Sequence, residues 1–316
     1  MNASHPILSS ALSSNECSTQ NLAKMRLVLA IATTGRAQIL AETVPDILRQ
    51  TRAPDLIVLS VAAKEDADPR LLEPFECPKL VVNGPRGLCA QRNRALEVLR
   101  PDDVLLLIDD DFLMAPDYIE QTLRLFHLHP DVVMATGTVL SDGIGGPGYD
   151  VAEGHAKLAR AKPPQVRALT DIYNGYGCNM AIRARPVLER GLRFDERLPL
   201  YGWLEDVDFS RQLSAGGRIV RSTALTGVHL GTKTGRTKGV RLGYSQIANP
   251  VYLIRKGTMS PRRALRMVGQ NVGTNLLRVW RPEPWIDRRG RLKGNLLALR
   301  DLLTGRMTPE RALTLR

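Results

Sequence analysis

Short aliphatic segments alternate with amphipathic ones along the first half of the chain, and this alternation limits the fold more than any other feature. Residues 26–32 (RLVLAIA) form a compact run of strand-forming residues that stops at TTGR, and apolar residues at helical spacing follow. The pattern then predicts strands over 56–61, 79–82 and 104–108, and helices over 87–100 and 116–129. Such alternation is typical of a mostly parallel sheet with helices on both faces.

The second half of the chain is less regular. A predicted strand over 132–139 leads into the Gly/Pro-rich stretch SDGIGGPGYD, and the polar region up to Asp171 has the composition of a loop or lid. Further elements are predicted as strands over 175–182 and 218–230 and short helices over 185–192 and 207–213. Beyond Tyr244 the pattern is helical to the C-terminus.

Composition excludes several classes of protein. The aromatic fraction of 5% argues against nucleic-acid modules that stack bases on aromatic side chains. The four cysteines form no CxxC pair, which argues against zinc and redox motifs and favours a reducing, cytoplasmic compartment. No apolar run approaches the roughly 18 residues of a transmembrane helix. We predict that the Ser/Asn-rich residues 1–24 form a disordered tail.

Almost all of the net charge of +12 lies in the last fifth of the chain, where residues 255–316 hold 15 Lys/Arg and only 4 Asp/Glu. Apolar residues recur among these charges at helical spacing, at Leu265, Val268, Val272, Leu276, Val279 and Trp280. The pattern fits a helix lying on an anionic membrane surface, and it fits equally a helix packed on the core with a solvated basic face. Binding to nucleic acid is not expected.

The stretch LLLIDDDF runs a buried strand directly into three carboxylates, Asp109, Asp110 and Asp111. Ligands of such sheets bind beyond the carboxyl ends of the strands. Adjacent carboxylates repel one another, so we expect a hard divalent cation, Mn²⁺ or Mg²⁺, as their partner. Alternate residues of an extended segment point the same way, so Asp109 and Asp111 are predicted to face one site while Asp110 turns aside or reaches another part of the ligand. The plain alternative is a polar turn that caps the next helix.

Six motifs occur in a fixed order: TTGR, NGPRGLCAQRN, IDDD, GYGCNMAIR, GWLEDVDFSRQL and VHLGTKTGR. Over residues 26–236 the chain therefore resembles the inverting glycosyltransferases of family 2. The resemblance implies a doubly wound sheet of the GT-A type over 25–243, with a Rossmann-like nucleotide-binding half and an acceptor half, and a helical basic extension over 244–316. It also implies a UDP-linked sugar donor and a saccharide or lipid-linked acceptor at the cytoplasmic face of a membrane.

The resemblance assigns roles to individual residues. Asp111 would bind the metal directly, Asp109 and Asp110 would lie nearer the ribose or act through water, and His229 would be a further ligand, although a lone histidine is often structural. Asp206 would be the base that takes the proton of the acceptor hydroxyl, with Glu205 and Trp203 binding the acceptor. The alternatives are a cap of the following helix for the acidic pair and a core position for Trp203.

The remaining predictions concern the donor nucleotide. Asp66 would bind the base of the nucleotide. The family usually has an acidic residue directly at the end of the second strand, whereas this chain has SVAA there. Lys233 and Arg236 lie in a loop that could close over the phosphates. The other predicted donor contacts are Thr33, Thr34, Arg36, Arg86, Arg92 and Asn93, each of which could instead serve a turn or a helix surface.

Two other functions fit parts of the pattern. Nucleotidyl transfer to a sugar phosphate also uses a doubly wound domain with carboxylate-bound metal, but it normally shows a Gly-rich loop with a lysine after the first strand, where this chain has TTGRAQ. An inert scaffold that only binds membrane would have no use for uncompensated acid at residues 109–111.

Overall fold

The computed structural model describes residues 25–161, 167–234 and 237–316. Within them, nine strands form one sheet in the order β3-β2-β1-β4-β8-β6-β9-β5, with β7 pairing to β9 beside this path. The strands are β1 (Leu27–Thr33), β2 (Leu56–Val61), β3 (Lys79–Asn83), β4 (Val104–Asp109), β5 (Phe112–Met114), β6 (Val132–Asp142), β7 (Leu169–Asp171), β8 (Asn179–Arg183) and β9 (Arg218–His229). The predicted tail over 1–24 lies outside the described residues.

The sheet has a parallel half and a mixed half. Strands β3, β2, β1 and β4 are parallel, as predicted. In the other half, β8 runs antiparallel to β4 and β6, β5 and β7 run antiparallel to β9, and β6 is parallel to β9. Parallel register places Ala32 beside Asp109, so the ends of β1 and β4 meet at one edge of the sheet.

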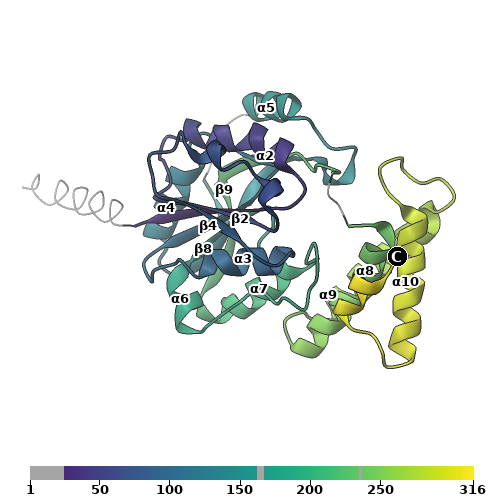
Figure 1. The fold of residues 1–316 in the computed structure, drawn as a ribbon. Helices are drawn as coiled ribbons and strands as arrows, with labels where there is room; N and C mark the ends of the chain where they lie inside the picture. The colour runs from purple at the N-terminus through teal and green to yellow at the C-terminus, as the bar shows by residue number, and fades with distance from the viewer. Residues whose placement is uncertain (1–24, 162–166, 235–236) are drawn as a thin grey trace, which may run out of the picture.

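Helices cover both faces of the sheet (Figure 1). Alternate residues of β1 show the reason: Leu27, Leu29 and Ile31 belong to one buried cluster, and Val28 and Ala30 belong to another. The first cluster also takes in side chains of α2 (Ala37–Thr43), the 3₁₀ helix η1 (Val44–Arg49) and α4 (Tyr118–Leu128). The second takes in α3 (Leu88–Leu96), α6 (Ala184–Glu189) and α7 (Glu205–Leu213).

The region predicted as a loop or lid contains a helix, α5 (Val151–Arg160). A capping box begins it, because Asp150 accepts from the Glu153 amide and Glu153 accepts from the Asp150 amide. Gly154 in its middle weakens the helical signal of the sequence. The glycine lets α5 lie close to the sheet, because a Cβ there would force the side chains of Leu230 and Leu113 to shift.

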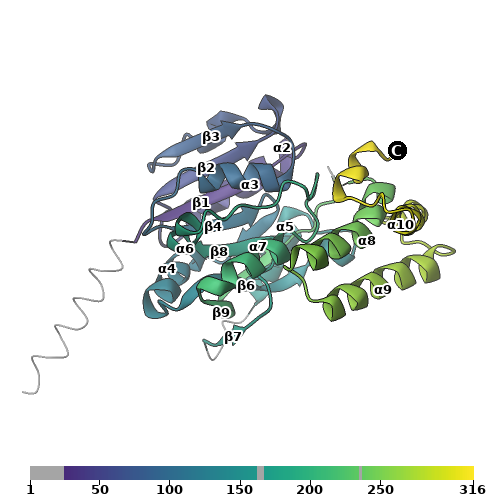
Figure 2. The same ribbon diagram turned by 90° about the horizontal axis from the view of Figure 1, so that it is seen from below.

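Three helices and a 3₁₀ turn form a C-terminal lobe, seen beside the sheet in Figures 1 and 2. They are α8 (Gly239–Lys256), α9 (Pro261–Arg278), α10 (Arg288–Leu303) and η6 (Pro309–Thr314). A Cβ at Gly243 or Gly294 would collide with the backbone of the facing helix, so α8 and α10 touch along their main chains. Leu253 of α8 joins the core beneath the sheet, which ties the lobe to it. Among the described helices, none combines the length and the apolar character needed to cross a bilayer.

Candidate active site

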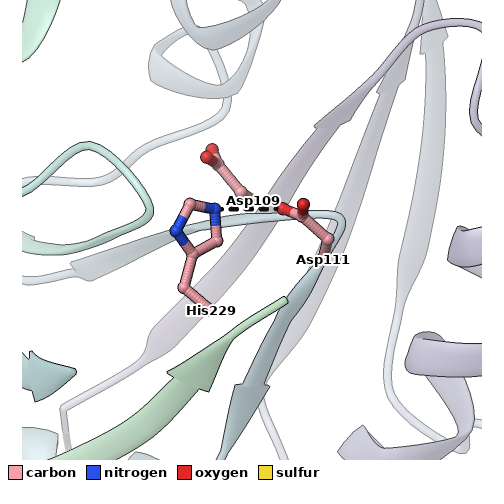
Figure 3. A group of neighbouring side chains, drawn as sticks. All are labelled: Asp109, Asp111 and His229. Carbon is pink, nitrogen blue, oxygen red and sulfur yellow. Dashed lines mark ion pairs between the residues drawn. The ribbon is translucent and has the colours of Figure 1, made fainter. Parts of the chain in front are cut away.

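Asp109, Asp111 and His229 come together at the carboxyl edge of the sheet and form the candidate metal cluster (Figure 3). One ligand atom from each lies within 4.8 Å of the others. The backbone explains the meeting. After Asp109 ends β4, the chain turns into β5, and the antiparallel pairing of β5 with β9 places Phe112 opposite His229. Asp111, the residue before Phe112, is thereby brought beside the imidazole.

Asp111 is the most enclosed carboxylate of the cluster. Its Oδ2 accepts a hydrogen bond from the Thr232 amide at 2.8 Å, and its Oδ1 lies 3.4 Å from Nε2 of His229. That Oδ1 is buried and has no hydrogen bond of ordinary geometry to any described residue. Burial would raise the pKa of Asp111, but His229 and Arg36 together hold it well below its usual range. Two carboxylates with one imidazole, one oxygen being unsatisfied, suit Mn²⁺ or Mg²⁺.

A residue that the sequence did not reveal orients His229. Oδ1 of Asp142, at the end of β6, lies 2.9 Å from Nδ1 of His229, and Oδ2 accepts a hydrogen bond from the Tyr176 hydroxyl at 2.6 Å. The ring is thus held with Nε2 toward Asp111. Burial lowers the pKa of His229, but the neighbouring carboxylates of Asp111 and Asp142 outweigh it and raise the pKa to about 10. Carboxylate support of this kind is common behind metal-binding histidines.

Asp110 bonds Thr33 and Arg36 beside the candidate metal cluster. Its Oδ2 accepts from Thr33 Oγ1 at 2.7 Å and its Oδ1 from Arg36 at 2.8 Å. Arg36 also donates to the carbonyls of Thr232 and Thr234, so it ties the loop after β9 to the end of β1. The structure therefore brings Thr33, Arg36 and Asp110 together beside the candidate metal cluster.

Arg92 links this cluster to the start of α7. Its guanidinium is only 2% exposed, pairs with Glu205 and with Asp109 at 3.1 Å, and donates to the Gly177 carbonyl at 2.7 Å. Asp206 Oδ2 accepts from the Gly177 amide at 3.2 Å. Burial raises the pKa of both Glu205 and Asp206, and Arg92 opposes this. Glu205 is buried against Arg92, so its carboxylate compensates that guanidinium in this structure.

The backbone that leads into α7 is held in an uncommon conformation. Leu200 and Leu204 have φ of 58° and 75°, in the left-handed region that side chains usually avoid. Such residues cost roughly 1–2 kcal/mol each and persist where the surroundings hold them. Leu204 is buried, and its turn sets Glu205 and Asp206 at the head of the helix.

Two predicted donor contacts, Asn93 and Asp66, bond within the protein. Asn93 is buried and bonds the backbone of Phe194 on both sides, with a further bond to Glu196. Asp66 accepts hydrogen bonds from the amides of Gly35, Ala62 and Ala63, so its carboxylate closes the loops after β1 and β2 rather than facing a base.

The other predicted residues are more scattered. Thr34 bonds Gln91 within the protein, Arg86 is exposed, and Trp203 is half-buried against the core beneath the sheet. Lys233 donates to the carbonyls of Gly143 and Ile144 in the turn after β6. Arg236 lies outside the described residues.

A family model agrees with this geometry. The model for glycosyl transferase family 2 matches residues 29–190, just over half of the chain. The chain belongs to glycosyl transferase family 2. A curated family relative, the glucosyl-dolichyl phosphate glucuronosyltransferase of Haloferax volcanii, is 28% identical over 173 residues, which cover 53% of this chain and 55% of that protein. The chain thus spans about half the length of this relative.

Solved structures confirm the GT-A fold. TarS 1-349 of S. aureus in complex with UDP-GlcNAc is similar over 91% of this chain and 83% of that one, with 13% identity and a TM-score of 0.56. GalNAc-T7 with UDP, GalNAc and Mn²⁺ is similar over 89% and 59%, with 14% identity and a TM-score of 0.50. Identities this low establish the fold and not the substrate.

Proposed function

We propose that this family 2 protein transfers a sugar from a UDP-linked donor, with inversion, to a saccharide or lipid-linked acceptor. One observation carries the proposal: the buried Arg92 guanidinium joins the candidate metal ligands, through Asp109, to Glu205 at the start of α7. Donor chemistry and acceptor chemistry each need carboxylates, and here the two sets meet at one edge of the sheet.

Asp109, Asp111 and His229 would hold Mn²⁺ or Mg²⁺. A divalent cation there supplies positive charge to the diphosphate that leaves, worth several kcal/mol. Arg36 adds a cationic side chain at the same edge, since it already lies 3.6 Å from Asp111. Thr33 holds Asp110 in place and so keeps Arg36 aimed at the cluster.

Asp206 is our candidate for the base. An inverting transfer requires a group on the face opposite the leaving group to take the proton of the attacking hydroxyl. Asp206 is partly accessible, whereas Glu205 beside it is buried against Arg92. Asp206 accepts hydrogen bonds from the amides of Gly177 and Val207, and such bonds favour its ionised form.

Neighbouring proteins support the proposed donor and acceptor. TarS 1-349 was solved with UDP-GlcNAc and GalNAc-T7 with UDP, which favours a uridine nucleotide here. The curated relative is named for a lipid-linked glucosyl phosphate, which favours a lipid-linked acceptor. We place the reaction at the cytoplasmic face of a membrane, in the assembly of a cell-surface polysaccharide or glycolipid.

A panel of nucleotide sugars tests the proposal. Thermal shift with and without Mn²⁺ should give stabilisation by a UDP-sugar that depends on the metal, and product analysis should give free UDP with the inverted anomer. Consumption of a nucleoside triphosphate with a sugar phosphate would instead identify a nucleotidyltransferase. Binding of a donor without any turnover on saccharide or lipid acceptors would identify an inert scaffold.

A further inference from the structure

The outer side of α9 and the turn that follows it expose large apolar side chains. Leu265, Leu276, Leu277 and Trp280 are 69%, 55%, 80% and 85% exposed. Val268 and Val272 lie on the inward flank of the same helical stripe, one turn from Leu265 and Leu276, and contact the apolar cluster that α8 and α10 share. Figure 2 shows α9 along the outer edge of the lobe. The predicted apolar stripe is therefore divided between the lobe's core and its surface. We call the four exposed residues, Leu265, Leu276, Leu277 and Trp280, the α9 face.

Gly269 and Gly273 leave this face shallow. A Cβ at either glycine would meet nothing within 4 Å, so both open directly outward. They lie between the leucines at the two ends of the helix, one and two turns after Leu265. The outward side of α9 thus presents bulky apolar side chains at its two ends and exposed glycine backbone at its middle.

Unpaired basic side chains surround the α9 face. Arg262 and Arg266 lie in its first two turns, and Arg281 follows Trp280. All three are exposed, and within the described ranges none of them has an ion pair. The helix itself, Pro261–Arg278, contains no Asp or Glu. The positive charge of this face is therefore available to a partner.

The few carboxylates of the C-terminal lobe are bound to other residues, so they do not neutralise the arginines around the α9 face. Each has a partner in the protein: Glu283 pairs with Arg278 and Arg288, Asp287 caps α10, buried Asp301 bonds Tyr244, and Glu310 pairs with Arg197.

The C-terminal end of α9, next to Trp280, is connected to the candidate active site. Trp285, in the loop between α9 and α10, donates to the Gly145 carbonyl at 3.4 Å. Gly145 closes the turn that begins at Asp142, the residue that orients His229. Trp280 lies five positions before Trp285, so the apolar end of the α9 face and the edge of the site are joined by one short loop.

We propose that the α9 face docks on an anionic lipid bilayer. Leucine and tryptophan side chains would enter the headgroup boundary, and the arginines would meet lipid phosphates. Nucleic acid is a poorer fit because the face offers leucines and glycine backbone rather than a row of aromatic rings on which bases could stack. A second copy of the same face is a poorer fit because the pairing would bring like charges together. The docking would set the site beside a lipid-linked acceptor, a consequence that rests on the proposed function.

Vesicle flotation of the full chain tests the docking. The protein should float with phosphatidylcholine vesicles containing about 30% phosphatidylglycerol and remain at the bottom with phosphatidylcholine alone. Each basic residue near an anionic surface contributes roughly fivefold to partitioning, so Arg262→Gln, Arg266→Gln and Arg281→Gln together should weaken it on the order of 100-fold. Leu277→Gln with Trp280→Gln should weaken it by roughly tenfold or more.

Matched variants serve as controls. Lys64→Gln, Arg100→Gln and Arg124→Gln remove the same charge from exposed positions beside the sheet, and Leu48→Gln with Leu188→Gln removes exposed leucines there. These should float like the wild type. Flotation on neutral vesicles as strong as on anionic ones, or equal loss in the face and control variants, would overturn the docking. Displacement of the vesicles by an oligonucleotide would also overturn it. So would a dimer in solution that dissociates in the Leu277→Gln, Trp280→Gln variant.

The docking and the transferase activity can fail separately. Flotation needs no donor, and metal-dependent stabilisation by a UDP-sugar needs no vesicle. Flotation that is lost in the face variants while no sugar is ever transferred would leave the docking standing and remove the proposed function. Transfer to a water-soluble acceptor by a protein that never floats would do the reverse.

Discussion

Replacing Asp142 by asparagine should weaken metal binding without disturbing the fold. The carboxylate Oδ1 lies 2.9 Å from Nδ1 of His229 and also accepts from the Ile144 amide at 3.0 Å. Asparagine keeps an oxygen in this place, so the orientation of the ring is preserved and only the negative charge behind it is lost. Loss of such support typically costs 10–100-fold in metal affinity, about 1.4–2.7 kcal/mol.

Isothermal titration with MnCl₂ at fixed pH measures the effect. The melting temperature in EDTA should stay within about 2 °C of the wild type, which shows that the fold survives. Tyr176→Phe is the matched control, because it removes the hydroxyl that donates to Oδ2 at 2.6 Å and leaves the charge in place. Its loss of affinity should stay below about tenfold.

The pH dependence gives a second readout. Carboxylate neighbours raise the pKa of His229 to about 10, so a metal ion must displace a proton from it. Affinity should therefore rise with pH between about 6 and 9 in the wild type. Without the Asp142 charge this pKa falls, and the slope should become shallower. An Asp142→Asn protein with wild-type affinity and slope would refute the reasoning, because His229 would then not be a ligand.

Three further results follow from the site. Asp206→Asn should lower kcat by about 10²–10⁴ with donor affinity by thermal shift unchanged, and an equal fall in affinity would contradict its role as base. Arg92→Met should cost roughly 3–5 kcal/mol of stability in denaturant titrations, because two buried carboxylates lose their cation. Burial and Asp206 already raise the pKa of Glu205 to about 8, and the loss of Arg92 raises it further, so this part of the penalty should be small below pH 8 and grow as pH rises above it; a penalty independent of pH across that range would refute this. Asp111→Asn should abolish the Mn²⁺-dependent stabilisation by UDP, and its persistence would place the metal elsewhere.

The sequence predicted the parallel half of the sheet and the candidate metal cluster for the same physical reason. Strands buried on both faces are continuous aliphatic runs, and three carboxylates directly after such a run need a partner. Asp142 was missed because β6 continues past its aliphatic part into polar residues, with shifts in register against β9. A strand of that kind gives no clear periodic signal, and its end cannot be located from the sequence.

The direction of individual side chains was the other limit. Arg92 and Asn93 are adjacent on α3, and a helix turns by about 100° per residue. Arg92 consequently reaches Asp109 while Asn93 faces the backbone of Phe194. A motif places both residues near the site, but only the packed helix decides which of them enters it. The same holds for Asp66, whose three amide partners come from two loops that the sequence leaves unplaced.

The two carboxylates that begin α7 should respond differently to neutralisation. Glu205 pairs with Arg92, whereas Asp206 has only backbone amides as hydrogen-bond partners in the described structure. Glu205→Gln leaves Arg92 its contacts with Asp109 and Gly177, so the transfer rate should fall by less than about tenfold, against 10²–10⁴ for Asp206→Asn. Steady-state rates at saturating donor make the comparison. Equal losses in the two variants would mean that the pair acts as one unit, and the assignment of the base to Asp206 alone would have to be abandoned.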